Sequence, residues 1–220
     1  MIGPLFEWDW VLDHLAEIRT QTWEHVVLTV IAVVSGLVIS FPLAIFAFRH
    51  RRAYAPITWI TGLLYTIPSL ALFVLLLPIF GLTTTTAEVG LVSYTLLILI
   101  RNTVAGLDAV PADTKEAALG MGYTRRQLLW KVELPLALPV IIAGVRIATV
   151  TTIGLVTVTA LIGKGGLGEF ILEGLNLFFS TPVVVGAVLS VVLALVADAL
   201  LLLVQRLLTP WTAAARTRAA

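Results

Sequence analysis

Long apolar runs separated by short polar segments dominate the sequence. A helix needs about 20 mostly apolar residues to cross the roughly 30 Å hydrocarbon core of a bilayer. The stretches that are long enough are Val26–Phe48, Ile57–Phe80, Ala87–Leu107, Pro135–Ile162 and Pro182–Gln205. Apolar and polar residues do not alternate along them, which indicates helices rather than the strands of a membrane barrel. The pattern therefore predicts an all-α integral membrane protein with about five transmembrane helices.

The composition excludes several other classes of protein. Hydrophobic residues make up 59% of the 220 residues, charged residues only 12%, and the mean hydropathy is +1.03. A soluble domain would carry roughly twice this charged fraction. The net charge of +1 argues against nucleic-acid binding, which needs a strongly basic face. The chain has no cysteine, so it forms no disulfide and no thiolate metal site.

Basic residues gather on one side of the predicted spans. Cytoplasmic segments of membrane proteins are enriched in Lys and Arg, so this side is expected to be the cytoplasm. The opposite segments contain only Arg19 and Lys164, together with most of the acidic residues. The N-terminus is therefore expected outside and the C-terminus in the cytoplasm. The basic residues on the cytoplasmic side are Arg49, Arg51, Arg52, Arg101, Lys115, Arg125, Arg126, Lys131, Arg206, Arg216 and Arg218.

These boundaries divide the chain into three parts. Residues 1–23 form an extracytoplasmic or interfacial segment, residues 24–208 a transmembrane domain, and residues 209–220 a cytoplasmic tail. Within the first part, Leu5–Trp23 mixes Trp, Leu and Ile with acids, which is typical of a helix lying on the outer surface. A loose tail is the alternative for this segment.

The loop at residues 109–134 between the third and fourth spans is expected to form two short helices. Asp113 can cap the first helix, with Glu116 three residues later completing a capping box. Thr124 and Gln127 repeat this arrangement for the second helix. The loop is therefore a compact helix pair outside the membrane. Ala117 and Ala118 are expected to expose surface close to the backbone, which suits insertion into a groove on a partner.

The spacing of residues in this loop resembles the EAA loop of binding-protein-dependent ABC permeases. In that family the loop is a coupling helix that docks on a cytoplasmic ATPase, and the proline starts the next span. Valine stands in this sequence where isoleucine is usual. The residues at the motif positions are Glu116, Ala117, Ala118, Gly122, Val132, Leu134 and Pro135.

Two flanking stretches resemble the osmoprotectant branch of the same family, which carries glycine betaine, choline or carnitine. Thr66–Leu72 reads TIPSLAL, and Ile162–Gly168 is similar to a glycine-rich signature that methionine and phosphonate permeases share. Gly163–Gly168 also fits a dinucleotide-binding pattern, but no strand–turn–helix unit surrounds it, so a structural role in the turn between spans is expected.

The resemblance implies the type I ABC importer permease fold and a set of partners. These are cytoplasmic ATPase subunits, a second permease copy or a sister permease, and an extracytoplasmic solute-binding protein. The chain itself has no phosphate-binding loop, so ATP is expected to be used by the partner ATPase, and no cofactor is expected here. Another cargo such as methionine remains an alternative, and a gated membrane channel is an alternative of another class.

Two sets of residues within the spans are candidates for transport or assembly. Tyr65, Pro68, Ser69 and Phe73 surround a proline break and either line the translocation pathway or pack between helices. An aromatic facing the pathway would attract a quaternary ammonium group. Arg146 and Asp198 are expected at similar depths, about 15 Å from the cytoplasmic ends of their spans, and are predicted to form an intramembrane ion pair.

No catalytic or metal site is expected. His14, His25 and His50 are scattered along the chain and form no ligand spacing for a metal ion. The sequence also lacks a nucleophile elbow and a paired-carboxylate site. The chemistry of this chain is therefore expected to be transport rather than catalysis.

Overall fold

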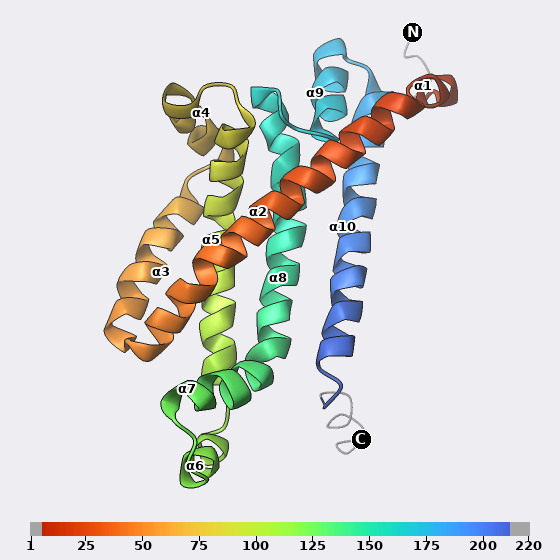
Figure 1. The fold of residues 1–220 in the computed structure, drawn as a ribbon. Helices are drawn as coiled ribbons and strands as arrows, with labels where there is room; N and C mark the ends of the chain where they lie inside the picture. Colours follow the sequence, from red (N-terminus) through yellow and green to blue (C-terminus); the bar gives the residue numbers. More distant parts are fainter. Residues whose placement is uncertain (1–5, 212–220) are drawn as a thin grey trace.

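The computed structural model describes residues 6–211, and every regular element in this range is a helix (Figure 1). Predictions for residues 1–5 and 212–220, including Arg216, Arg218 and most of the tail, lie outside the described residues. In chain order the elements are α1 Trp8–Asp13, α2 Leu15–Arg49, α3 Arg51–Thr66, α4 Ser69–Phe80, α5 Thr84–Asp108, α6 Ala112–Gly120, α7 Arg125–Leu128, η1 Leu129–Glu133, α8 Leu134–Val156, η2 Thr157–Ile162, α9 Gly168–Leu177 and α10 Ser180–Leu208.

Four of the five predicted spans correspond to single helical stretches, and the remaining one is bent. Among the described residues, α2, α5, α10 and the continuous stretch Arg125–Ile162 are each long and apolar enough to cross a membrane. The predicted span Ile57–Phe80 is not one helix, because α3 and α4 meet at a bend of 97°. Counting the bent pair as one span gives up to five. This all-helical architecture confirms the predicted fold class.

The bend between α3 and α4 follows from Pro68. Proline lacks a backbone N–H and disfavours the helical conformation of the preceding residue, and Ile67 has an extended ψ of 129°. The carbonyl oxygen of Ile67 accepts a hydrogen bond from the Tyr94 hydroxyl of α5. A carbonyl that would otherwise lack a partner within the bundle is therefore satisfied by a neighbouring helix.

The bundle is built around α5. This helix packs against α2, α3, α4 and α8, whereas α10 packs against α8 and α9 (Figure 1). Gly106 illustrates the closeness of the α5–α8 contact, since a β-carbon there would lie 2.9 Å from the carbonyl oxygen of Ala137. Helix α10 leaves most of its apolar surface exposed. The fold therefore has a packed centre and one lightly covered helix.

The N-terminal part differs from the prediction of a separate surface helix over Leu5–Trp23. Only α1 is separate, because α2 begins at Leu15 and continues into the first span. His14 interrupts the helix, and its Nδ1 lies 2.7 Å from the carbonyl oxygen of Trp10. No Gly or Pro follows between Leu15 and Trp23, so nothing ends the helix before the apolar run.

The two ends of the bundle carry different elements (Figure 1). We call the end with α6 and α7 the α6 end, and the opposite end, with α1, α4 and α9, the α9 end. At the α9 end, the loop from Gly163 to Gly168 packs closely on its neighbours, as its predicted structural role requires. Gly166 has a φ of +49°, and a β-carbon there would lie 2.8 Å from the Gln21 carbonyl oxygen in α2. Glu169 follows this loop in the first turn of α9, and burial raises the pKa of its carboxyl group above the usual value.

Candidate functional site

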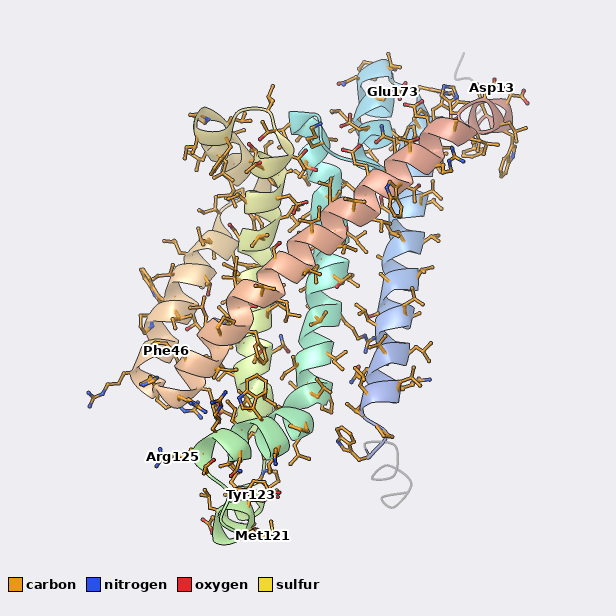
Figure 2. All side chains as sticks on the ribbon, in the orientation of Figure 1. Asp13, Phe46, Met121, Tyr123, Arg125 and Glu173 are labelled. Carbon is orange, nitrogen blue, oxygen red and sulfur yellow. The ribbon has the colours of Figure 1, made fainter. Side chains whose placement is uncertain are left out.

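The segment from α6 to η1 projects beyond the ends of α5 and α8 (Figure 1). Figure 2 shows Met121, Tyr123 and Arg125 at this projecting end, while Asp13 and Glu173 lie at the opposite end. Met121 is 71% exposed and Leu119 is 46% exposed. An apolar tip on a rigid projection is suited to contact with a partner.

The start of α6 differs from the predicted capping box. Pro111, rather than Asp113, occupies the N-cap position, and no side chain caps the helix there. Proline is extended here, with ψ at 140°, and α6 begins at the following residue. Asp113 therefore lies in the first helical turn, where its negative charge interacts favourably with the helix dipole.

The end of α6 depends on Gly122. The Tyr123 N–H donates to the Ala118 carbonyl over 3.1 Å, and the Gly122 N–H donates to the Leu119 carbonyl over 2.9 Å. This pair of bonds is the Schellman motif, which needs a left-handed residue after the helix. Gly122 has a φ of +86°, a conformation that other residues adopt at a conformational cost. The motif glycine thus sets the turn between α6 and α7.

The second helix starts as predicted and then continues differently. Thr124 and Gln127 form a complete capping box, which confirms that prediction. Pro135 lies in the first turn of α8, as predicted, but α8 continues directly from α7 and η1 in one stretch instead of starting after a break. The η1 turn is a π-helix, in which the Leu134 N–H donates to the Leu129 carbonyl. This wider turn lies just before Pro135, whose ring would crowd the backbone of a regular α-helix.

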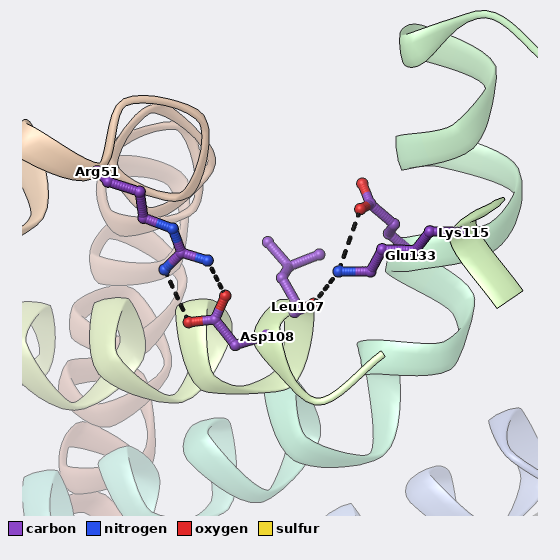
Figure 3. A network of polar contacts seen from close by, with 5 residues as sticks. All are labelled: Arg51, Leu107, Asp108, Lys115 and Glu133. Atoms are coloured by element: carbon purple, nitrogen blue, oxygen red, sulfur yellow. Dashed lines mark hydrogen bonds and ion pairs between the residues drawn. The ribbon is translucent and has the colours of Figure 1, made fainter. Parts of the chain in front are cut away.

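A partly buried ion pair connects α6 with η1 (Figure 3). Lys115 Nζ lies 3.5 Å from Glu133 Oε1 and donates to the Leu107 carbonyl of α5 over 3.2 Å. Glu133 is 6% exposed, so its carboxylate interacts with Lys115 rather than with bulk water. One side chain of α6 therefore contacts both the end of α5 and the turn that leads into α8.

A second ion pair joins α3 to α5 (Figure 3). Both terminal nitrogens of Arg51 donate to the Asp108 carboxylate. The guanidinium and the Lys115 ammonium lie over the Phe48 ring, at 5.1 and 5.3 Å from its centroid. Neither pair was predicted from the sequence, although Arg51 and Asp108 are opposite charges at span ends on the same predicted side.

The motif residues divide into exposed and buried positions. Glu116 and Ala117 are exposed, as a contact surface requires. Ala118 is only 2% exposed, so the expectation that it offers backbone-close surface is wrong. Leu134 is buried, and Val132 and Pro135 are half-buried in the stretch leading into α8. Only part of the motif therefore faces outward.

The predicted pathway residues do not share one environment. Pro68 and Tyr65 are exposed and Ser69 is half-buried, all close to the α3–α4 break. Phe73 is fully buried in a core cluster with Leu28, Leu91 and their neighbours, so it lines no open surface here. Its packing against α5 requires Gly90, where a β-carbon would overlap the Phe73 ring.

The structure brings Arg146 and Asp198 together. Arg146 Nε and Nη2 donate to the two carboxylate oxygens over 2.8 and 2.7 Å. Gln205 of α10 extends the contact, since its Nε2 donates to the Pro139 carbonyl over 3.2 Å. These bonds join α8 to α10 beside an open groove of about 720 Å³ lined mostly by apolar residues.

Within residues 6–211, no group of three or more His, Asp or Glu side chains is arranged to hold a metal ion. His25 is buried in α2, with Nε2 lying 3.0 Å from the Ile153 carbonyl oxygen, and thus takes part in helix packing.

Comparisons with known proteins agree with this architecture. Residues 24–210 match the family model described as "Binding-protein-dependent transport system inner membrane component". The chain is 38% identical over 194 residues to the choline transport system permease protein OpuBB of Bacillus subtilis, covering 88% of this chain and 89% of that protein. It is also 38% identical over 206 residues to the osmoprotectant import permease protein OsmW of Salmonella typhimurium, covering 91% and 96%.

Solved structures show the same fold. A chain of the inward-facing MetNI methionine ABC transporter superposes with a TM-score of 0.79 at 22% identity, covering 90% of this chain and 98% of that one. A chain of an amino acid ABC transporter gives a TM-score of 0.77 at 18% identity, covering 91% and 98%.

Proposed function

The chain belongs to the family of binding-protein-dependent transport system inner membrane components, and we propose that it imports a small quaternary ammonium osmoprotectant. It is a multi-pass membrane component of an ABC transporter rather than an enzyme. The cargo class, namely glycine betaine, choline or carnitine, rests on one observation: the 38% identity to permeases of choline and osmoprotectants across nearly their full length.

The proposed orientation places the α6 end in the cytoplasm and the N-terminus outside. Arg49, Arg51, Lys115 and Arg125 cluster at the α6 end, in agreement with the enrichment of basic residues in cytoplasmic segments. The exposed tip of α6, with Leu119 and Met121, then docks on the partner ATPase, which uses the ATP. A second permease and an extracytoplasmic solute-binding protein complete the transporter.

The coupling role is assigned to the α6–η1 segment. When the ATPase displaces α6, the Lys115 contacts with Leu107 and Glu133 pass the displacement to α5 and α8. Gly122 fixes the angle between α6 and α7 through its left-handed backbone. Coupling therefore depends on the shape of this segment as well as on its exposed surface.

Uptake measurements test the cargo and the coupling together. Cells deleted for the gene are supplied with radiolabelled glycine betaine, choline, carnitine or methionine and complemented with wild type, Gly122→Val or Gly120→Ala. Both glycines have open space around them, but only Gly122 has a positive φ, which a β-branched residue hardly adopts. Wild type and Gly120→Ala should restore uptake of at least one osmoprotectant, and Gly122→Val should not.

The outcomes separate the parts of the proposal. If wild type restores uptake of methionine alone, the cargo is methionine and not an osmoprotectant. If wild type restores uptake of none of the four compounds, the proposed cargo class is wrong. Full activity of Gly122→Val at equal membrane abundance would contradict the coupling role of the α6–α7 turn.

A further inference from the structure

Arg101 is a charged side chain in the membrane-spanning helix α5. It precedes Asp108, at the end of α5, by seven residues, which corresponds to about 10 Å along the helix. The side chain is exposed, and it forms no hydrogen bond or ion pair with any residue in the described part of the chain. A charge at this depth is unfavourable in lipid and normally faces a partner group or a water-filled path.

The surroundings of Arg101 form a groove between α3 and α5 of about 500 Å³. Residues on the groove wall include Thr58, Trp59, Tyr65, Thr66 and Leu97 as well as Arg101. Tyr65 and Thr66 are the last residues of α3 before the break at Ile67 and Pro68. The groove thus leads from Arg101 towards the irregular backbone between α3 and α4, the type of feature that lines transport sites.

Trp59 lies at the same level as Arg101. The Arg51–Asp108 ion pair joins the start of α3 to the end of α5, so depths along both helices are counted from that pair. Trp59 follows Arg51 by eight residues, or about 12 Å, close to the 10 Å of Arg101. The indole is 76% exposed. A cation and a large aromatic face therefore line the groove at one depth.

Tyr65 offers a second aromatic ring further along the groove. It makes an edge-to-face contact with Tyr94, with ring centroids 5.8 Å apart. Tyr94 in turn donates its hydroxyl to the Ile67 carbonyl at the break. The ring therefore packs against α5 at the end of α3, beside the groove.

We propose that Arg101 and Trp59 form a transient site for a small zwitterion that has a carboxylate and a quaternary ammonium group. The Arg101 guanidinium binds the carboxylate by charge-assisted hydrogen bonds, and Trp59 binds the ammonium by cation–π attraction. Tyr65 is the next aromatic contact for the ammonium group. This inference rests on the proposed function and assigns it specificity residues: Arg101 distinguishes glycine betaine and carnitine from choline, which has no carboxylate.

The test is a comparison of substrates within one complemented strain. Uptake of glycine betaine, carnitine and choline is measured for wild type, Arg101→Gln, Arg101→Lys, Trp59→Leu and Trp59→Phe, with membrane abundance measured by immunoblot. Arg101→Gln should lower uptake of both carboxylates about tenfold relative to choline, since a charge-assisted hydrogen bond contributes roughly a factor of ten or more. Arg101→Lys keeps the charge and should show a smaller ratio change.

The aromatic substitutions and a control complete the design. Trp59→Leu should lower uptake of all three compounds, and Trp59→Phe should retain most of it, because phenylalanine preserves an aromatic face. Arg52→Gln, which removes an exposed arginine at the start of α3, should leave the substrate ratio unchanged. If Arg101→Gln does not reach the membrane, the uptake of both carboxylates relative to choline is compared between Arg101→Lys and wild type instead.

The alternatives give different results. An equal loss of all three substrates, or no loss, would overturn the site. The equal loss would indicate that Arg101 interacts with a lipid phosphate or a partner carboxylate. Failure of wild type to restore any of the three would overturn the proposed function, and this inference with it.

Discussion

The two ends of the bundle differ in the balance between backbone contacts and charged side-chain contacts. At the α9 end the contacts are between backbones: a β-carbon at Gly186 would lie 2.6 Å from the Leu167 carbonyl oxygen, and one at Gly174 would lie 2.6 Å from that of Phe179. At the α6 end the helices α5 and α8 also approach closely at Gly106, but α3 and α6 are joined to their neighbours by charged side chains, namely Arg51 with Asp108 and Lys115 with Glu133.

This difference has mechanical consequences. Glycine contacts bring helix backbones close together, so a small displacement produces overlap or a void. Ion pairs between long side chains can follow a displacement by changing rotamers while the charges stay close. We therefore expect the α9 end to be the stiffer of the two. The α6 end, where the proposed ATPase contact lies, is joined in a way that permits adjustment.

The largest expected effect is at the α9 end. Gly168→Ala would place a β-carbon against the Thr157 carbonyl oxygen and backbone, which cannot withdraw as a side-chain tip can. We expect a loss of about 3 kcal/mol in stability, the upper part of the range for overpacking, and low abundance in the membrane. Thermal unfolding of the purified protein in nanodiscs measures the change.

Gly154→Ala is the matched control, because Gly154 lies in α8 with nothing within 4 Å of its β-carbon position. It should be neutral or slightly stabilising. Equal unfolding temperatures for both variants would contradict the description of the α9 end as backbone-packed.

Helix α10 takes part in both kinds of contact, since Gly186 packs near its start and Asp198 pairs with Arg146 further along. Arg146→Asp leaves two carboxylates facing each other in the membrane, and we expect a loss of about 2–3 kcal/mol. Adding Asp198→Arg should restore most of the stability and the membrane abundance. A double variant as unstable as the single one would show that the pair is not what holds α10.

Loss of the Lys115–Glu133 pair should lower stability less than loss of the Arg146–Asp198 pair, and its main effect should be on coupling to the ATPase. Lys115→Met leaves the Glu133 carboxylate without its cation, and because the Lys115 side chain is 23% exposed, water can partly replace it, so we expect a loss of about 1–2 kcal/mol. Lys115→Met with Glu133→Leu should recover stability but not solute-stimulated ATPase activity of the assembled transporter. Normal solute-stimulated ATPase activity in the double variant would show that the pair is not needed for coupling.

Features that depend on local composition could be predicted from the sequence. The apolar runs predicted four spans that are single helical stretches and a fifth that is a bent pair, and the Thr124–Gln127 spacing predicted a capping box that the structure contains. Asp113 shows the limit of such rules, because Pro111 occupies the capping position two residues earlier. Both residues fit a helix start, and the sequence pattern alone did not distinguish between them.

Features that depend on contacts between distant residues could not be predicted. The break at Pro68 was expected, but neither the bend of 97° nor the hydrogen bond by which Tyr94 of α5 satisfies the Ile67 carbonyl was. Likewise, Phe73 was a pathway candidate by sequence position, and the absence of a side chain at Gly90 places it in the core. These outcomes depend on which helix lies opposite.

The smallest loss of stability is expected for the Arg51–Asp108 pair at the α6 end, in contrast to the large loss expected for Gly168 at the α9 end. The two side chains are 58% and 40% exposed, so water and salt screen their attraction. Arg51→Gln should lower stability by only about 0.5 kcal/mol, and the difference from wild type should shrink further as ionic strength rises. Unfolding temperatures of both proteins measured at low and high salt test this expectation. A loss comparable to that of Gly168→Ala, unchanged by salt, would mean that the α6 end is locked as rigidly as the α9 end.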